Sequence, residues 1–130
     1  MKKNVKPASS LSLHLRLRVV GAEKIALGPG KADLLDLIAE SGSLGKAAKR
    51  MEMSYMKAWS LVQTMKPLVE LTRGGQRGGG ATLTPLGRQA LALYRQMECD
   101  SRAACEDSWQ KFQQLALAGS AGTKRSRTKP

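Results

Sequence analysis

The stretch from Ser43 to Met65 constrains the fold more than any other, because it has the pattern of a helix-turn-helix. Apolar residues recur at helical spacing in two short segments, and a serine precedes each segment. Ser43 and Ser54 are suited to cap the two helices, since each hydroxyl can accept an unpaired backbone N–H. The small side chains of Ala47 and Ala48 allow two helices to cross closely. The second helix is short and outwardly polar or basic, which is typical of a recognition helix for the DNA major groove.

The charge of the chain favours a polyanionic partner. Its 130 residues include 22 lysines and arginines but only 10 aspartates and glutamates, which gives a net charge of +12. Such an excess of cations suits nucleic acid first and an anionic membrane surface second. The length allows one domain with its own core and an appendage, but hardly two domains.

Other classes of protein are excluded by residues that the sequence lacks. No apolar run reaches the roughly 18 residues of a membrane span. The basic N-terminus has no hydrophobic signal segment, so we expect a cytoplasmic protein. Cys99 and Cys105 would lie about 120° apart around a helix and could not pair within it. With a single histidine as well, we expect no metal and no cofactor. The absence of a Ser-His-Asp set or of a shared carboxylate pocket argues against an enzyme.

The N-terminal third of the chain predicts an arm, a strand and a helix. Residues 1–10 are polar and basic, and we expect a disordered arm there. From Leu11 to Val19 apolar and polar residues alternate strictly, which predicts a half-buried strand, and residues 25–27 can add a second short one. Pro29 marks the start of a helix that ends around Ser41 and Gly42 and packs behind the helix-turn-helix.

A wing is predicted directly after the recognition helix. Residues 68–72 and 81–84 favour two strands, and the loop at 73–80 has five glycines in eight positions. The glycines let the backbone follow a groove, while Arg73 and Arg77 add positive charge. The alternative is a surface hairpin whose arginines have no role in binding. We therefore predict a winged helix-turn-helix domain over residues 11–84, mainly α-helical with a small β-sheet.

A long helix is predicted over residues 85–117 and a disordered basic tail over residues 118–130. This helix would be longer than a domain of this size can cover, which indicates a partner chain. The alternative is that the first strand of the same chain covers its apolar side. We expect a homodimer held by apolar residues at approximate three-four spacing along the helix: Leu93, Met97, Ala104, Trp109, Phe112 and Leu115.

Several short motifs resemble one known family. The most specific are Ser54-Tyr55 followed by Ala58-Trp59, and a glycine run that leads through Ala81 to Leu83-Thr84 and the helical Gly87. The other matches are Ser41-Gly42-Ser43-Leu44, Ala47-Ala48-Lys49, Met65, Gly74-Gly75 and Gly78-Gly79-Gly80. Over roughly residues 11–117 the chain thus resembles the N-terminal DNA-binding domain of ModE-type molybdate-responsive transcriptional regulators. LysR-type winged helices share the general layout but not the two specific motifs.

The sequence departs from that family at two places. Glu52 stands in the interhelical turn, where members commonly have glycine. If this residue has a positive φ, its side chain costs about 1 kcal/mol. The family's molybdate-binding module should follow the long helix, and no such module follows in this sequence. We therefore expect no molybdate binding by this chain alone.

The polar side of the second helix predicts the contacts with DNA bases. It lies opposite the apolar residues when each residue advances by about 100°. Bulky Trp59 lies at the border, and packing against the wing is its more common role. Base contacts usually come from the N-terminal part of a recognition helix, and a glutamine can bind an adenine edge. We expect base contacts from Tyr55, Met56, Lys57, Ser60 and Gln63.

Contacts with the DNA backbone are expected around this helix. Ser43, Lys46 and Arg73 are candidate phosphate contacts, and Arg77 at the tip of the wing can enter the minor groove. The capping residue Ser54 belongs to the same DNA-binding set.

These patterns predict a sequence-specific transcriptional regulator that binds double-stranded DNA as a homodimer. The recognition helix would enter the major groove, and the wing would contact the backbone or the minor groove. The alternative is a nucleoid-type or RNA-binding basic protein with little sequence preference. The scarcity of aromatic residues for base stacking argues against single-stranded RNA. A structural partner protein is a further alternative, if the long helix alone carries the function.

Overall fold

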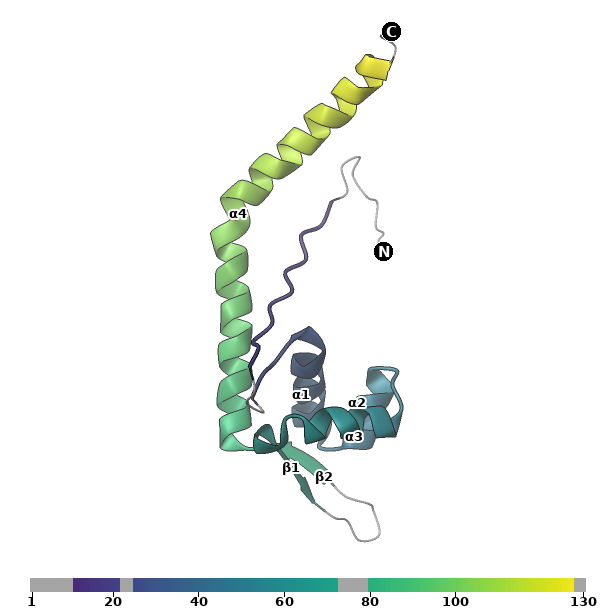
Figure 1. Cartoon of the computed structure of the whole chain (residues 1–130), viewed down its shortest axis with the longest axis vertical. Helices are drawn as coiled ribbons and strands as arrows, with labels where there is room; N and C mark the ends of the chain where they lie inside the picture. The colour runs from purple at the N-terminus through teal and green to yellow at the C-terminus, as the bar shows by residue number, and fades with distance from the viewer. Residues whose placement is uncertain (1–10, 22–24, 73–79, 128–130) are drawn as a thin grey trace. The chain divides into compact units, whose positions relative to one another are not determined.

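The computed structural model describes residues 11–21, 25–72 and 80–127, with side chains as far as residue 119 (Figure 1). The chain forms two compact units. One is Arg16–Glu98, and the other comprises the described residues of Met1–Leu15 and Cys99–Pro130. The elements of the first unit, in chain order, are α1 (Pro29–Ser41), α2 (Leu44–Arg50), α3 (Tyr55–Gln63), η1 (Lys66–Leu68), β1 (Val69–Thr72), β2 (Gly80–Leu83) and the beginning of α4 (Pro85–Arg127).

The predicted helix-turn-helix is confirmed together with its caps. The Ser43 hydroxyl accepts the backbone N–H of Lys46 at 3.1 Å, and the Ser54 hydroxyl accepts that of Lys57 at 3.0 Å. Each cap satisfies one of the unpaired N–H groups at the start of its helix. Helix α1 begins at Pro29 as predicted, and Gly42 ends it in the left-handed region with φ of 69°.

The turn between α2 and α3 contains the residue singled out in the sequence. Glu52 has φ of 57°, and it is the only non-glycine residue with positive φ among the described ones. The backbone N–H of Met53 donates to the carbonyl of Ala48 at 3.0 Å, which closes the turn. A non-glycine residue in this conformation costs on the order of 1 kcal/mol, so Glu52 is a local source of strain.

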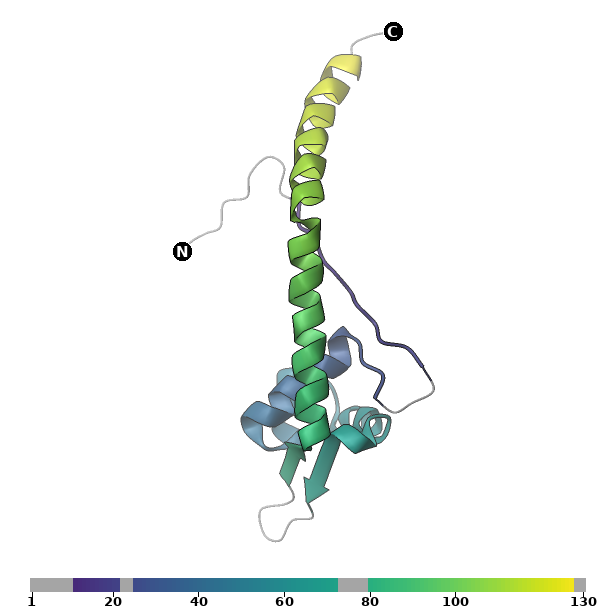
Figure 2. The ribbon, with the colours of Figure 1, turned by 90° about the vertical axis from the view of Figure 1, so that its left-hand side faces the viewer.

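The wing is an antiparallel hairpin, and its strands lie within one residue of their predicted positions. Strand β1 pairs with β2 from Val69↔Leu83 to Thr72↔Gly80. The N–H of Ala81 donates to the carbonyl of Gly42 at 3.0 Å, which fixes the hairpin to the end of α1. Figures 1 and 2 show the hairpin projecting from one end of this unit. Its tip, with the predicted contacts Arg73 and Arg77, lies outside the described residues.

The core of the first unit lies between α1, the helix-turn-helix, the wing and the first turns of α4. Tyr94 is 1% exposed, and its hydroxyl donates to the carbonyl of Leu17 at 2.7 Å. Gly87 allows α4 to lie directly on η1, because a Cβ atom at this position would stand 2.1 Å from the carbonyl oxygen of Leu68. The fully buried large side chains are Leu34, Leu35, Ile38, Val62, Met65, Leu68 and Tyr94.

The strand predicted from Leu11 to Val19 is wrong as an assignment of secondary structure. The segment contains no ladder in the described chain, and its backbone pairs only at one place, where Val19 and Leu27 exchange two hydrogen bonds of 2.7 and 3.2 Å. The alternation itself is present, since Leu13, Leu15 and Leu17 are half-buried while the polar residues between them are exposed. One side of the segment is thus covered without the neighbouring strand that a sheet requires.

The last helix continues beyond its predicted end. It extends to Arg127, whereas a disordered tail was expected from residue 118. Helix formation is cooperative, and no proline stands between Pro85 and Pro130 to end the helix. In the second unit, Arg102 donates to the carbonyl of Leu13 at 2.6 Å, and the rings of Trp109 and Phe112 stack with centroids 6.1 Å apart.

Candidate nucleic-acid interface

Helix α3 presents a largely apolar outer side next to the wing. Its inner side is closed, with Ala58 and Val62 at most 1% exposed. On the outer side Tyr55, Met56 and Trp59 are 54%, 66% and 41% exposed. The structure thus places two of the predicted base contacts, Tyr55 and Met56, at the free surface of the first turn. Ser60 is exposed on the next turn, and Gln63 at the end of the helix is half-buried.

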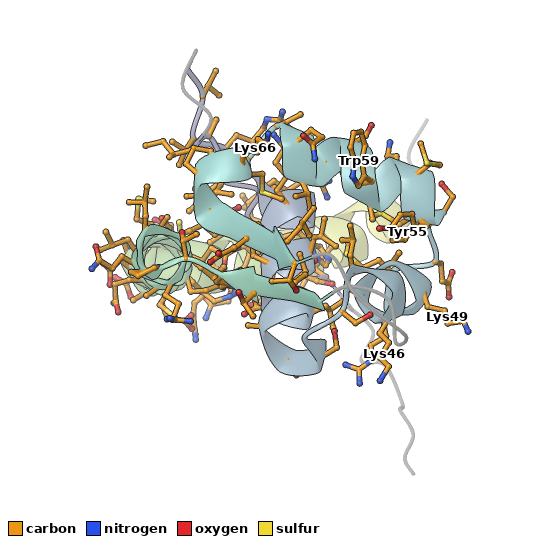
Figure 3. All side chains as sticks on the ribbon, turned by 90° about the horizontal axis from the view of Figure 1, so that it is seen from below. Lys46, Lys49, Tyr55, Trp59 and Lys66 are labelled. Carbon is orange, nitrogen blue, oxygen red and sulfur yellow. The ribbon has the colours of Figure 1, made fainter. Side chains whose placement is uncertain are left out.

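Trp59 belongs to this outer surface, although the sequence favoured a packing role for it. Figure 3, which looks at the end from which the wing projects, shows Trp59 with Tyr55 on α3 and Lys66 just beyond the helix. Tyr55 and Trp59 fall within about 40° of one another around the axis of α3, whereas Lys66 belongs to η1. The four-residue spacing of Tyr55 and Trp59 was visible in the sequence, but the exposure of a tryptophan depends on the packing of its neighbours.

Lys57 lies on the opposite flank of α3. It lines a cavity of about 520 Å³ together with Arg18 and Lys31, which come from the N-terminal segment and from the first turn of α1. Around the helix, Lys57 is separated by about 160° from Trp59. Lys57 thus lies away from Tyr55 and Trp59, but it is within about 60° of Ser60, which is exposed on the same helix.

The predicted phosphate contacts Ser43 and Lys46 lie at the start of α2. Ser43 lines a cavity of about 300 Å³ with Tyr55 of α3 and with Leu71 and Thr72 of the wing. This places the beginning of α2, the beginning of α3 and the wing around one depression. Lys46 is exposed beside it, whereas the hydroxyl of Ser54 is already engaged as a helix cap.

The charge around this surface is positive. Figure 3 shows Lys46 and Lys49 projecting from α2, and Lys66 lies on the other side of the aromatic pair. Helices α2 and α3 and η1 contain no carboxylate. Among the described residues, only Arg50 of these segments forms an ion pair, with Glu40 at 2.6 Å. Lys46, Lys49 and Lys66 thus form no ion pair with any carboxylate of the described residues, and their charges are available to a ligand.

Three carboxylates gather between α1 and α4. Arg95 forms ion pairs with Asp33, Asp36 and Glu98 at 2.6–2.8 Å. Burial alone would lower the pKa of Arg95, but its hydrogen bonds to the three carboxylates raise that pKa above its ordinary value. This guanidinium is therefore always charged and links the two helices, and it is not available to a ligand.

The described residues contain no group of three or more histidine, cysteine, aspartate or glutamate side chains that could hold a metal ion. Within the same residues, no helix combines the length and the hydrophobicity needed to cross a membrane.

Comparisons with known proteins place the chain near bacterial regulators. No family model matches it. The molybdenum transport protein ModE of Azotobacter vinelandii is 38% identical over 86 residues, which cover 62% of this chain and 32% of that protein. The molybdenum-pterin-binding protein MopB of Rhodobacter capsulatus is 39% identical over 61% of this chain and 28% of its own length. The DNA-binding transcriptional dual regulator ModE of Escherichia coli K12 is 39% identical over 55% of this chain and 29% of its own length.

The chain therefore matches about a third or less of the length of these relatives. Two solved structures have a similar fold. They are ZitR of Lactococcus lactis, with a TM-score of 0.53 over 78% of this chain and 76% of that chain, and FabT of Streptococcus pneumoniae in complex with DNA, with a TM-score of 0.50 over 78% and 74%. Both are at most 16% identical to this chain, so they show the fold alone. That fold is a winged helix, as predicted from the sequence.

Proposed function

We propose that this chain, a homologue of the ModE-type regulators over 62% of its length, is a sequence-specific DNA-binding transcriptional regulator. The observation that carries the proposal is the outer side of α3. It holds exposed side chains at the positions from which recognition helices contact bases, and lysines surround it. The FabT structure with DNA supports the proposal, because a chain of similar fold binds DNA there. The protein acts by binding and not by catalysis, in the cytoplasm, where bacterial DNA is found.

The binding mode follows from the arrangement of the helices. Helix α3 enters the major groove, and Lys46 and Lys49 of α2 contact phosphates on one side of it. Lys66 contacts phosphates on the other side. The wing continues along the backbone or into the minor groove, with Arg73 and Arg77 as its cationic residues. Each lysine that neutralises a phosphate releases a counterion, so the affinity falls as the salt concentration rises.

The proposed active form is a homodimer, held through the second half of α4. Phe112 and Leu115 are 56% and 69% exposed, and Leu117 is 47% exposed. The segment around Leu13 covers part of the same helix, since Leu13 lines a cavity with Trp109 and Phe112. That contact leaves most of Phe112 and Leu115 uncovered. Burying a large apolar side chain is worth about 1.5–3 kcal/mol, so several of them can offset the cost of association.

A nucleoid-type protein with little sequence preference is the alternative, and one experiment separates the two. The full chain is used to select bound duplexes from a random pool, and the enriched sequences are compared. A regulator that binds as a dimer enriches a palindrome whose half-sites lie about one helical turn apart. Binding with no enriched motif would favour the nucleoid-type protein and would refute the proposal. Binding of molybdate by this chain alone is not expected, and calorimetry with the oxyanion tests that expectation.

A further inference from the structure

The first turn of α3 carries apolar side chains where base contacts are expected. Met56 is 66% exposed, the largest exposed fraction among the large apolar residues of this helix. Tyr55 and Trp59 lie beside it on one side of the helix and are 54% and 41% exposed. Exposing apolar area costs free energy in water, so an exposed apolar patch among lysines indicates a ligand with an apolar contact point.

The polar side chains of α3 offer few other contacts in its first two turns. Guanine is typically bound through arginine or lysine, and adenine through asparagine or glutamine. The helix has no arginine and no asparagine, and Lys57, its one lysine, also lines the cavity at the start of α1. Gln63 is half-buried in the last turn. Ser60 and Lys57 are therefore the exposed polar side chains of α3 nearest to Met56.

The major groove presents one apolar group, the C5-methyl of thymine, which apolar side chains contact. We propose that Met56, next to Tyr55 and Trp59, determines specificity by contacting thymine methyl groups on the floor of the major groove. The inference rests on the proposed function and extends it, because it names the chemical group that α3 recognises. Half-sites bound by this protein then contain thymine at the positions that face the first turn of α3.

The distribution of charge selects DNA over a protein partner as the occupant of this surface. Lys46 and Lys49 lie on one side of Tyr55 and Trp59, and Lys66 lies on the other. No carboxylate is present in α2, α3 or η1, and Glu52 stands in the turn between α2 and α3. A major groove has the complementary pattern, with phosphates along both rims and methyl groups on the floor. Positive rims around an apolar centre thus fit a duplex in which thymines line the groove.

The test uses a duplex selected by the full chain and the same duplex with deoxyuridine in place of thymidine. This change removes the methyl group and retains the base pairing. Dissociation constants are measured by fluorescence anisotropy at one fixed salt concentration. We expect the affinity to fall about fourfold for each contacted methyl group, as the transfer free energy of one buried CH₂ group implies.

Three variants assign the effect to Met56. Met56→Leu keeps an apolar side chain and should retain the preference for thymidine, whereas Met56→Ala should bring the ratio of the two affinities close to one. Lys66→Ala is the matched control, because it should weaken binding to both duplexes by the same factor and leave their ratio unchanged. Both positions are exposed, so thermal unfolding should be unchanged, and circular dichroism verifies this.

The outcomes distinguish failure of the inference from failure of the proposed function. An enriched motif whose affinity does not change with deoxyuridine would overturn the role of Met56 and leave the regulator intact. A thymidine preference that Met56→Ala retains would also overturn it, since the methyl groups would then act on the shape of the groove or on another residue. If no motif is enriched, the proposed function fails and the inference fails with it.

Discussion

The winged-helix unit and the second half of α4 use similar apolar side chains in opposite ways. In Arg16–Glu98 the large apolar residues close on one another, and seven of them are less than 2% exposed. In Cys99–Gly119 none of the described residues is buried, and Phe112, Leu115 and Leu117 are half exposed or nearly so. The first region is complete by itself. The second leaves large apolar side chains exposed, and this exposure is what the proposed dimer would cover.

The largest effect is expected from placing the same charge in each region. Ala48 is 2% exposed in α2, so Ala48→Glu buries a carboxylate that has no partner and should destabilise the fold by about 3–5 kcal/mol. Ala104 is exposed in the part of α4 that belongs to the second unit, so Ala104→Glu should leave the unfolding of the winged helix unchanged while it weakens dimerisation. Thermal unfolding followed by circular dichroism and sedimentation velocity measure the two quantities.

Either of two results would refute the proposed difference between the two regions. If Ala104→Glu unfolded the protein as Ala48→Glu does, folding would depend on the second half of α4. If Ala104→Glu sedimented in the same state as the unchanged chain, this side of the helix would not form the dimer.

Replacing one glycine in each region of α4 with alanine should change the free energy of unfolding by smaller amounts and in opposite directions. A Cβ atom at Gly87 would lie 2.1 Å from the carbonyl oxygen of Leu68, so Gly87→Ala should force the backbones apart at a cost of about 1–3 kcal/mol. At Gly119 nothing lies within 4 Å of the added atom, and Gly119→Ala should stabilise the helix by about 0.5–1 kcal/mol. Urea unfolding and helix content at 222 nm test the pair, and a neutral Gly87→Ala would show that α4 does not need this close approach.

The features that the sequence predicted correctly depend on residues that lie close together in the chain. The caps at Ser43 and Ser54, the turn at Glu52 and the start of α1 at Pro29 depend on residues a few positions apart, so local chemistry determines them. The wing strands were also predicted to within one residue, because Pro67 and the glycine run bound them. These local signals were sufficient for the fold class.

Features that depend on distant contacts were predicted less well. The alternation from Leu11 indicated that the apolar side chains of this segment would be partly buried. It did not indicate that they would pack against a helix rather than a neighbouring strand. The position of Lys57 beside Arg18 and α1, and the exposure of Trp59, depend on how α3 packs against elements far away in the sequence. The contacts proposed for Arg73 and Arg77 stay predictions, because both residues lie outside the described chain.

The last effect concerns Tyr94, where the first part of α4 meets the core. Tyr94→Phe removes the hydrogen bond to the carbonyl of Leu17 and should cost about 1 kcal/mol. Tyr55→Phe is the matched control, because its hydroxyl is on the exposed side of α3 and its loss should leave the free energy of unfolding unchanged.

Alkaline pH sharpens this test. Burial, and next the negative charge of Glu98, raise the pKa of Tyr94 above its ordinary value of 10.0. The unfolded chain therefore loses this proton at a lower pH than the folded chain does. The stability that Tyr94 contributes is fully present below pH 10 and decreases as the pH rises from there through the raised pKa. Urea unfolding between pH 8 and about 11 should show a steeper loss of stability in the unchanged chain than in Tyr94→Phe. If stability fell with pH at the same rate in the unchanged chain and in Tyr94→Phe, burial would not raise the pKa of Tyr94. Tyr94 would then be accessible to water at this end of α4.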